Sequence, residues 1–129
     1  MTQLSKNPIH KDIYYSIRDD FLWVLSSFHS QDETKSFFYD FFTKTERDMF
    51  AKRLATALLI RKGYEWRDIQ FLLHVSTATI SRISNWLDRE GGGVKPVLDK
   101  LIRQEHVEKF LDKVDRFIET RIAKPWMTK

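Results

Sequence analysis

Residues 65–87 constrain the fold more than any other part of the chain, because they have the pattern of two helices joined by a tight turn. Apolar residues recur there at steps of three and four, which places each set on one face of its helix. These residues are Ile69, Leu72 and Leu73 before the turn, Val75 in the turn, and Ile80, Ile83 and Leu87 after it. The pattern predicts a helical hairpin in which Val75 fills the corner between the helices.

The second helix of this hairpin leaves a face of mostly short side chains pointing outward. The predicted outward residues are Thr77, Ala78, Ser81, Arg82 and Asn85. A helix that enters the major groove needs short side chains near its N-terminus to approach the base edges. Residues 69–87 also contain no acidic residue, although the chain has 18 Asp and Glu, and carboxylates would be repelled by phosphates. The segment predicts a DNA-reading helix; the alternative is an ordinary hairpin with an exposed face rich in Ser and Thr.

Two positions depart from a tight helix-turn-helix pattern. Gln70 stands where Ala is usual, and His74 stands where the turn usually has Gly. We expect Gln70 to point its amide outward and His74 to adopt positive φ, which His tolerates better than most residues.

Composition favours one helical domain, or one domain with an appendage. Among 129 residues there are only four Gly and three Pro, and no alternating run of strand length stands out, which predicts an all-α protein. The absence of cysteine indicates a reducing, intracellular setting. No segment has the length and hydropathy of a signal peptide or membrane span. We therefore expect a soluble cytoplasmic protein with no membrane partner.

The net charge of +4 is unevenly distributed along the chain. Residues 1–42 sum to −2, whereas residues 43–90 and 91–129 each sum to +3. The basic excess thus lies in and after the predicted hairpin, as expected for a protein that binds nucleic acid.

Three further helices are predicted before the hairpin. The first runs over about 11–28, and Asp32 is the expected N-cap of the second, which ends in the aromatic run 37–42. Thr43 and Glu46 have the spacing of a capping box at the start of the third, which runs to Lys62, with Gly63 as its C′ residue. Its expected inward residues are Met49, Phe50, Leu54, Ala57 and Leu58.

The aromatic run Phe37-Phe38-Tyr39-Asp40-Phe41-Phe42 places aromatic rings on more than one helix face. Such density is typical of an interface between subunits, where aromatic residues are enriched. The alternative is a large core within one chain.

The glycines at 91–93 are the strongest loop signal, and the pattern divides the chain there. We expect a domain over residues 1–90, a glycine hinge at 91–94 and a helical extension over 95–129. Pro96 suits the first turn of a new helix, a change of phase predicts a bend near Gln104–Glu105, and residues 123–129 should be frayed.

Residues Thr34–Leu87 resemble the Trp repressor superfamily, and especially its YerC/YecD branch of Trp repressor-like proteins. The resemblance is carried by five segments. They are the run 37–43, Glu46-Arg47, Ala51-Lys52-Arg53-Leu54, Leu58-Leu59 with Gly63, and Val75-Ser76-Thr77-Ala78-Thr79-Ile80-Ser81-Arg82. The resemblance implies an all-α, intertwined homodimer that binds double-stranded operator DNA and regulates transcription. Beyond about Val97 no family pattern is visible.

In the tryptophan-responsive members two arginines hold the corepressor, and Arg53 and Arg82 fall at the matching positions, with Thr43 at a third pocket position. That pocket needs a glycine after the second arginine, but Ile83 stands there. We therefore do not expect a tryptophan corepressor. Arg82 is then a phosphate contact and Arg53 a partner in an ion pair on the helix face, unless these residues bind another small anionic effector.

The resemblance and the pattern together predict the DNA contacts. Ser76 should cap the reading helix, whose first amides can face a phosphate. Thr77, Ala78 and Ser81 should approach base edges, Arg82 and Asn85 should bind the backbone or a guanine edge, and Arg67 should bind phosphate. The DNA-binding set is Arg67, Ser76, Thr77, Ala78, Thr79, Ser81, Arg82 and Asn85.

No catalytic or metal-binding constellation is apparent in the sequence. The four histidines are scattered without ligand spacing, and there is no glycine-rich phosphate loop after a strand. We expect a protein that is not an enzyme and needs no cofactor. The alternative to a DNA-binding regulator is a helical protein-interaction module that keeps the fold without binding DNA.

Overall fold

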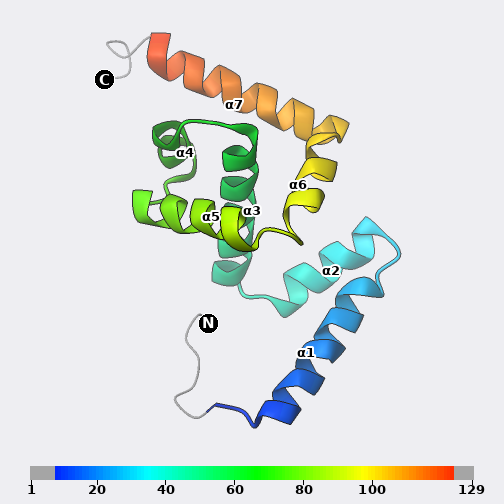
Figure 1. The fold of residues 1–129 in the computed structure, drawn as a ribbon. Coiled ribbons are helices and arrows are strands. Elements are labelled where there is room, and N and C mark those ends of the chain that lie inside the picture. The colour runs from blue at the N-terminus through cyan, green and yellow to red at the C-terminus, as the bar shows by residue number, and fades with distance from the viewer. Residues whose placement is uncertain (1–7, 124–129) are drawn as a thin grey trace. The chain divides into compact units, whose positions relative to one another are not determined.

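The computed structural model describes residues 8–123, with side chains to residue 121. The described chain is all-helical and contains no strand, which confirms the predicted fold class. Figure 1 shows the seven helices of this part of the chain, which are α1 (Lys11–Ser26), α2 (Gln31–Phe41), α3 (Lys44–Lys62), α4 (Trp66–Leu73), α5 (Thr77–Glu90), α6 (Lys95–Ile102) and α7 (Glu105–Ala123).

The chain forms two compact units, Met1–Phe50 and Ala51–Lys129, with the boundary inside α3. The first unit contains α1, α2 and the start of α3. The second contains the rest of α3 and the helices α4 to α7. The predicted division of the chain at residues 91–94 stays a prediction.

Local hydrogen bonds set the helix boundaries in the first unit. The predicted N-cap of α2 was wrong: Ser30, not Asp32, accepts the Glu33 amide at 3.1 Å. Ser30 has the extended backbone that an N-cap needs, whereas Asp32 lies in the first turn, where its charge suits the helix dipole. The capping box of α3 is confirmed, because the Thr43 amide donates to Glu46 at 2.9 Å and the Glu46 amide donates to the Thr43 hydroxyl at 3.1 Å.

The first unit has no fully buried side chain among its described residues, 8–50. Its aromatic rings contact one another, with Phe37 stacked on Phe41 at 4.9 Å between ring centroids. Ile13 and Ile17 on α1 are nevertheless more than half exposed. The inward face expected for α3 is confirmed at Ala57 and Leu58, which are buried, and was wrong at Met49, Phe50 and Leu54, which are exposed in the single chain.

The core of the second unit is built on the predicted apolar frame of the hairpin. Leu59 on α3, Ile69 on α4 and Ile80 on α5 are almost completely buried. Gly63 ends α3 with φ of 89°, and the Tyr64 amide donates to the Leu59 carbonyl at 3.0 Å. This geometry confirms Gly63 as the C′ residue, because a left-handed backbone favours glycine there.

The last two helices complete this core. Gly91 ends α5 at a place where an added Cβ would lie 2.3 Å from the Leu87 carbonyl oxygen, so only glycine fits. The predicted bend is confirmed, because α6 ends at Ile102 and α7 begins at Glu105. The buried core residues of these helices are Leu98, Val107, Leu111 and Val114. The fraying predicted for 123–129 falls, from residue 124 on, outside the described residues.

Within the described part of the chain no helix is both long enough and apolar enough to cross a bilayer.

Candidate nucleic-acid interface

The turn between α4 and α5 has the geometry that the sequence predicted. His74 adopts φ 55° and ψ 43°, and its amide donates to the Gln70 carbonyl at 2.9 Å. It is the one non-glycine residue with positive φ in the described chain. Val75 is half-buried against the core, and Gln70 is exposed. The left-handed turn and the buried part of Val75 thus place α5 across the end of α4.

Ser76 caps α5 as predicted. Its hydroxyl accepts the Thr79 amide at 3.1 Å and donates to the Thr79 hydroxyl at 2.9 Å. The cap satisfies one of the amides that have no partner within the first turn of a helix. The amides of Thr77 and Ala78 lie in the same turn, where the helix dipole favours an anion such as a phosphate.

The two faces of α5 differ as the apolar pattern predicted. Ile80, Ile83 and Leu87 are buried in the core. On the opposite side the exposed residues are Thr77, Ala78, Arg82 and Asn85. Thr79 and Ser81 are half-buried, so Ser81 is less open than the outward set implied. The exposed face therefore begins with two short side chains and continues with longer polar ones.

Arg82 lies along the start of this face. Its Nη2 donates to the Thr79 hydroxyl at 3.2 Å, and Thr79 in turn is held by Ser76. Thr79 thus serves as an internal partner, not as a side chain free to approach a base. The chain of bonds holds the guanidinium of Arg82 over the first turn of the helix.

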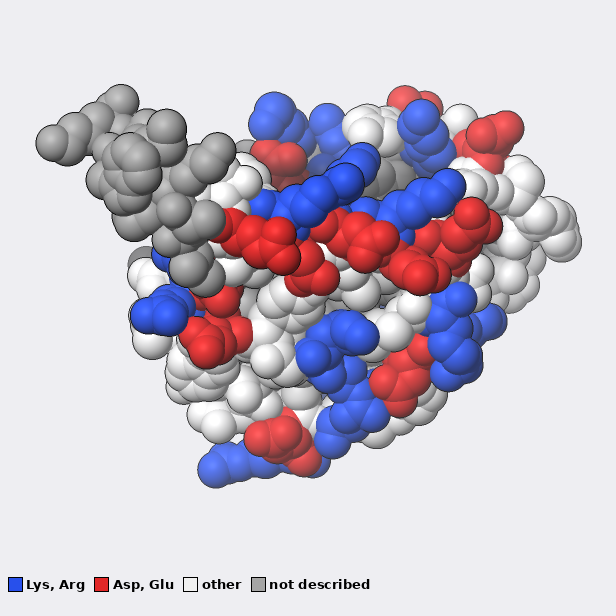
Figure 2. Space-filling model, turned by 90° about the horizontal axis from the view of Figure 1, so that it is seen from above, with Lys and Arg blue, Asp and Glu red and all other residues white. Residues whose placement is uncertain are grey.

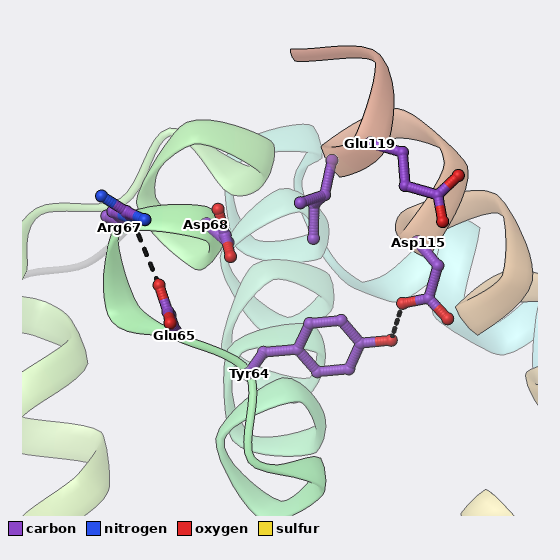
Figure 3. Close-up of a pocket in the computed structure, with 7 residues that line it drawn as sticks. Tyr64, Glu65, Arg67, Asp68, Asp115 and Glu119 are labelled. Atoms are coloured by element: carbon purple, nitrogen blue, oxygen red, sulfur yellow. Dashed lines mark hydrogen bonds and ion pairs between the residues drawn. The ribbon is translucent and has the colours of Figure 1, made fainter. Parts of the chain in front are cut away.

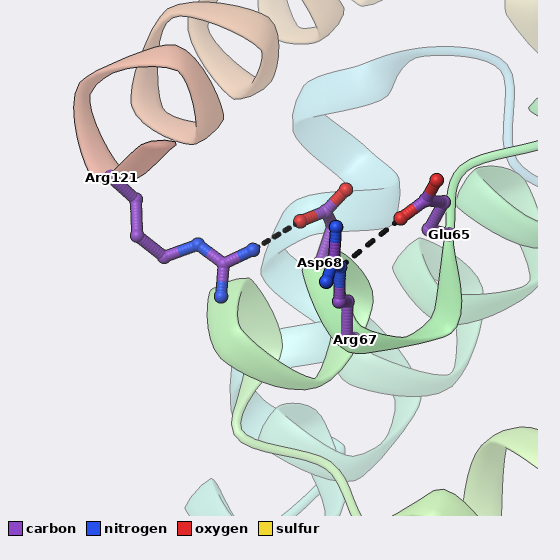
Figure 4. A network of polar contacts seen from close by, with 4 residues as sticks. All are labelled: Glu65, Arg67, Asp68 and Arg121. Atoms are coloured by element: carbon purple, nitrogen blue, oxygen red, sulfur yellow. Dashed lines mark hydrogen bonds and ion pairs between the residues drawn. The ribbon is translucent and has the colours of Figure 1, made fainter. Parts of the chain in front are cut away.

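The acidic residues next to this surface are held by arginines (Figure 4). Arg67, at the start of α4, binds Glu65 at 3.2 Å with both side chains exposed. Asp68 is buried, and its carboxylate accepts a hydrogen bond from Arg121 of α7. Asp68 therefore adds no free carboxylate to the surface beside residues 69–87, because its side chain points into the protein and is paired with Arg121.

The three residues proposed for an effector pocket have other contacts. Thr43 caps α3, and Arg82 binds Thr79. Arg53 was expected to form an ion pair on the helix face. It lies instead over the ring of Trp86, with 4.7 Å between the guanidinium carbon and the ring centroid. Ile83 is only 5% exposed, so its side chain fills core space next to Arg82.

Sequence reasoning missed the partners that join distant elements. Trp86 stacks on Arg53, Arg121 binds Asp68, and the Tyr64 hydroxyl donates to Asp115 at 2.5 Å. The last two pairs lie 53 and 51 residues apart. Helical spacing relates residues within one helix only, so it carries no signal for such pairs.

An open pocket of about 430 Å³ lies between the start of α4 and the last turns of α7 (Figure 3). Its lining is mostly acidic and includes the carboxylates of Glu65, Asp115 and Glu119. Burial raises the pKa of the Tyr64 hydroxyl, and the hydrogen bond to Asp115 raises it further. Tyr64 therefore stays protonated and remains the donor in that bond.

Comparison with known proteins identifies the family but no individual relative. No curated protein and no solved structure gives a match. Residues 18–102, about two thirds of the chain, match the family described as Trp repressor protein. This is a family of helix-turn-helix DNA-binding regulators and not of enzymes. The YerC/YecD branch stays a prediction. With its helix-turn-helix at α4–α5 and its match over most of its length, the chain belongs to the Trp repressor family.

Proposed function

We propose that the protein is a sequence-specific regulator of transcription that binds a dyad operator as a homodimer, with α5 of each subunit in the major groove. The observation that carries this proposal is the surface of α5. Its N-terminal turn exposes Thr77 and Ala78, no acid follows until Asp88, and Ile80 and Ile83 anchor the opposite side. A groove-reading helix requires this combination of a close-approaching face and a rigid back.

Each predicted contact is assigned from its place on this surface. Thr77 and Ala78 approach base edges, and Arg82 and Asn85 bind the DNA backbone or a guanine edge. Ser76 presents the amides at the start of the helix to a phosphate. The half-buried Ser81 stays in the proposed set, while Thr79 positions Arg82. Two reading helices related by a dyad would bind half-sites about 34 Å apart.

Arg67 must change partners to bind phosphate. In the free protein it pairs with Glu65, and both side chains are largely exposed. Exposed ion pairs contribute little to stability, so exchanging a carboxylate for a phosphate costs little. Arg67 would then add one cation at the start of α4, beside the groove-reading helix.

The first unit supports the proposed homodimer. Its described residues include the aromatic run of α2 but no fully buried side chain. Apolar helices need a partner surface to be stable in water, and aromatic residues are enriched where subunits meet. A second copy would supply that surface.

We also propose that tryptophan is not the corepressor. Ile83 occupies the position where the tryptophan-responsive proteins have glycine, and it is buried in the core between α5 and its neighbours. Making room for an indole ring there would require repacking that core, which is costly in a close-packed interior.

The substitution Thr77→Asp tests the placement of α5. A carboxylate in the first turn of a helix is favourable for the helix dipole, so the variant should fold as well as the natural protein. In the groove the same carboxylate would face phosphates, and binding should be lost for every DNA sequence. Fluorescence anisotropy with labelled duplexes selected by the natural protein from a random library measures the effect.

Thr120→Asp is the matched control, because Thr120 is exposed on α7 and its hydroxyl bonds only locally, to the Arg116 carbonyl. It makes the same charge change and should leave binding almost intact. The natural protein should lose affinity steeply as salt is raised. Unchanged binding by the Thr77→Asp variant would refute the placement, and no binding at any salt by the natural protein would favour the protein-interaction module.

A further inference from the structure

Helix α7 lies outside the family match, which ends at residue 102, yet it packs directly on the helix-turn-helix. We propose that α7 is a brace for α4, and that Arg121 and Asp68 are positioning residues for DNA recognition. This inference rests on the proposed function. It assigns a role in sequence recognition to a helix that the resemblance left unexplained.

Arg121 contacts α4 at two successive turns. It donates to the Asp68 carboxylate in the first turn, and its guanidinium carbon lies 4.5 Å from the ring centroid of Phe71 in the next. Phe117, one turn earlier on α7, packs its ring against Phe71 at 5.4 Å between centroids. Figure 4 shows Arg121 reaching from α7 to Asp68. One side chain therefore holds both the start and the middle of α4.

These contacts matter because apolar packing fills only part of the seam between the two helices, where Phe117 meets Phe71. The open pocket of about 430 Å³ lies there, bordered by Tyr64, Asp68 and Asp115 (Figure 3). Two polar ties, Tyr64–Asp115 and Asp68–Arg121, bridge this seam. Packing of Ile69 fixes which face of α4 points inward, while the ties fix where its N-terminal end lies.

The ion pair has a second effect, which is on the position of α4. Asp68 is one of the two acids that flank the acid-free run of 69–87, Asp88 being the other, and its side chain is 11% exposed. With Arg121 in place, this carboxylate is both buried and neutralised. Without that partner, an unpaired charge would be left in the interior, where it is strongly unfavourable, and α4 would move to hydrate it.

The charged side chains of α7, of which Asp115 and Glu119 also line the pocket beside α4, argue that this helix supports α4 and does not bind DNA itself. Its exposed acids Glu108, Asp112, Asp115 and Glu119 recur at steps of four and three, as do Lys109, Lys113 and Arg116. Such spacing gives two adjacent stripes of opposite sign. Figure 2 shows acidic and basic side chains in neighbouring rows on this side of the molecule. A surface of mixed sign does not attract phosphates in the way a basic face does.

The test compares Arg121→Met with Arg116→Met, which removes the same charge from the exposed basic stripe of α7. Two affinities are measured by anisotropy for each full-length variant. One is for the duplex that the natural protein selects from a random library, and the other is for unselected random duplex. Arg121→Met should weaken binding to the selected duplex by roughly tenfold, the size of losing one good base contact, and leave random-duplex binding unchanged. Arg116→Met should change neither by more than about twofold.

The salt dependence separates positioning from direct contact. If Arg121 bound a phosphate, the slope of log K against log salt would fall by about one and both duplexes would lose affinity. If the substitution only unfolded the protein, both affinities would fall in proportion to the folded fraction seen by circular dichroism. The first result would overturn the proposal, and the second would move the test to a variant that removes both charges of the pair.

A second variant covers the case in which Arg121→Met does not fold, because it leaves Asp68 buried and unpaired. Asp68→Asn combined with Arg121→Met removes both charges and the tie together. Hydrogen exchange of the α4 amides, measured without DNA, should be faster in this double variant than in Arg116→Met. Unchanged α4 protection would refute the brace. Faster exchange with no DNA binding by the natural protein would uphold the brace and reject the proposed function.

Discussion

His74 places a left-handed backbone at the corner of the helix-turn-helix, where glycine would fit without strain. An L-residue in this conformation costs about 1–2 kcal/mol, and asparagine, aspartate and histidine bear it best. The amide of His74 bonds to the Gln70 carbonyl, so the conformation is built into the end of α4 and cannot relax without breaking that bond.

Replacing His74 should therefore change stability in opposite directions. His74→Gly should raise the free energy of unfolding by about 0.5–1 kcal/mol, because relief of strain exceeds the extra entropy of glycine in the unfolded chain. His74→Val should lower it by more than about 1 kcal/mol, since a β-branched residue fits this region poorly. Urea unfolding at one fixed protein concentration measures both. A His74→Val variant as stable as the natural protein would contradict the argument.

At the residue scale, the sequence predicted what depends on local chemistry. The Ser76 cap, the capping box of Thr43 and Glu46 and the left-handed Gly63 were all predicted, because each is set by neighbours within a few residues. The choice between Ser30 and Asp32 as a cap was missed. Both residue types cap well, and only the backbone conformation distinguishes them.

At the element scale, the helices were predicted and their partners were not. Periodicity identified the buried face of α5, and the phase change located the break before α7. The ties between elements were missed because they join residues far apart in the chain. One of them, Arg61 on α3 with Asp99 on α6, is a two-bond pair with both distances 2.9 Å.

The Arg61–Asp99 pair should make stability depend on pH. The hydrogen bond from Arg61 lowers the pKa of Asp99 below its ordinary value of 3.8, and the charge of Arg61 lowers it further. A carboxyl with a depressed pKa contributes stability above about pH 3.8, and that contribution is lost as the pH falls through its folded-state pKa. Asp99→Asn should therefore lose less stability than the natural protein between about pH 6 and about pH 3.

Urea unfolding midpoints at the two pH values measure this difference. Some acid sensitivity should remain, because the hydrogen bond from the Thr43 amide also lowers the pKa of Glu46. Asp112→Asn, on the exposed stripe of α7, is the matched control and should follow the natural profile. If the Asp99→Asn and Asp112→Asn variants both follow that profile, the pair contributes nothing to the pH dependence.

At the scale of the whole molecule, the two units differ in how far one chain can stabilise them. The second unit has a core that draws on all of its helices. The first has clustered aromatic rings but no fully buried side chain among its described residues. The sequence indicated this imbalance through its aromatic run, yet a pattern within one chain cannot say whether the covering surface comes from the same chain or from a second copy.

The proposed dimer predicts that one charged substitution on α1 should dissociate the protein. Ile17 is 52% exposed and lies one turn after the similarly exposed Ile13, so Ile17→Glu would place a carboxylate in a surface that the partner should bury. Sedimentation equilibrium should give twice the chain mass of 15.5 kDa for the natural protein and about 15.5 kDa for the Ile17→Glu variant.

Ser16→Glu is the matched control. Ser16 lies next to Ile17 on α1 and is also exposed, so the substitution adds the same charge on a different face and the variant should remain dimeric. Because folding of the first unit is then coupled to association, the thermal midpoint of the natural protein should rise with protein concentration. A natural protein that sediments as a monomer at micromolar concentration, with a midpoint independent of concentration, would show that the exposed face of α1 is not covered by a second copy.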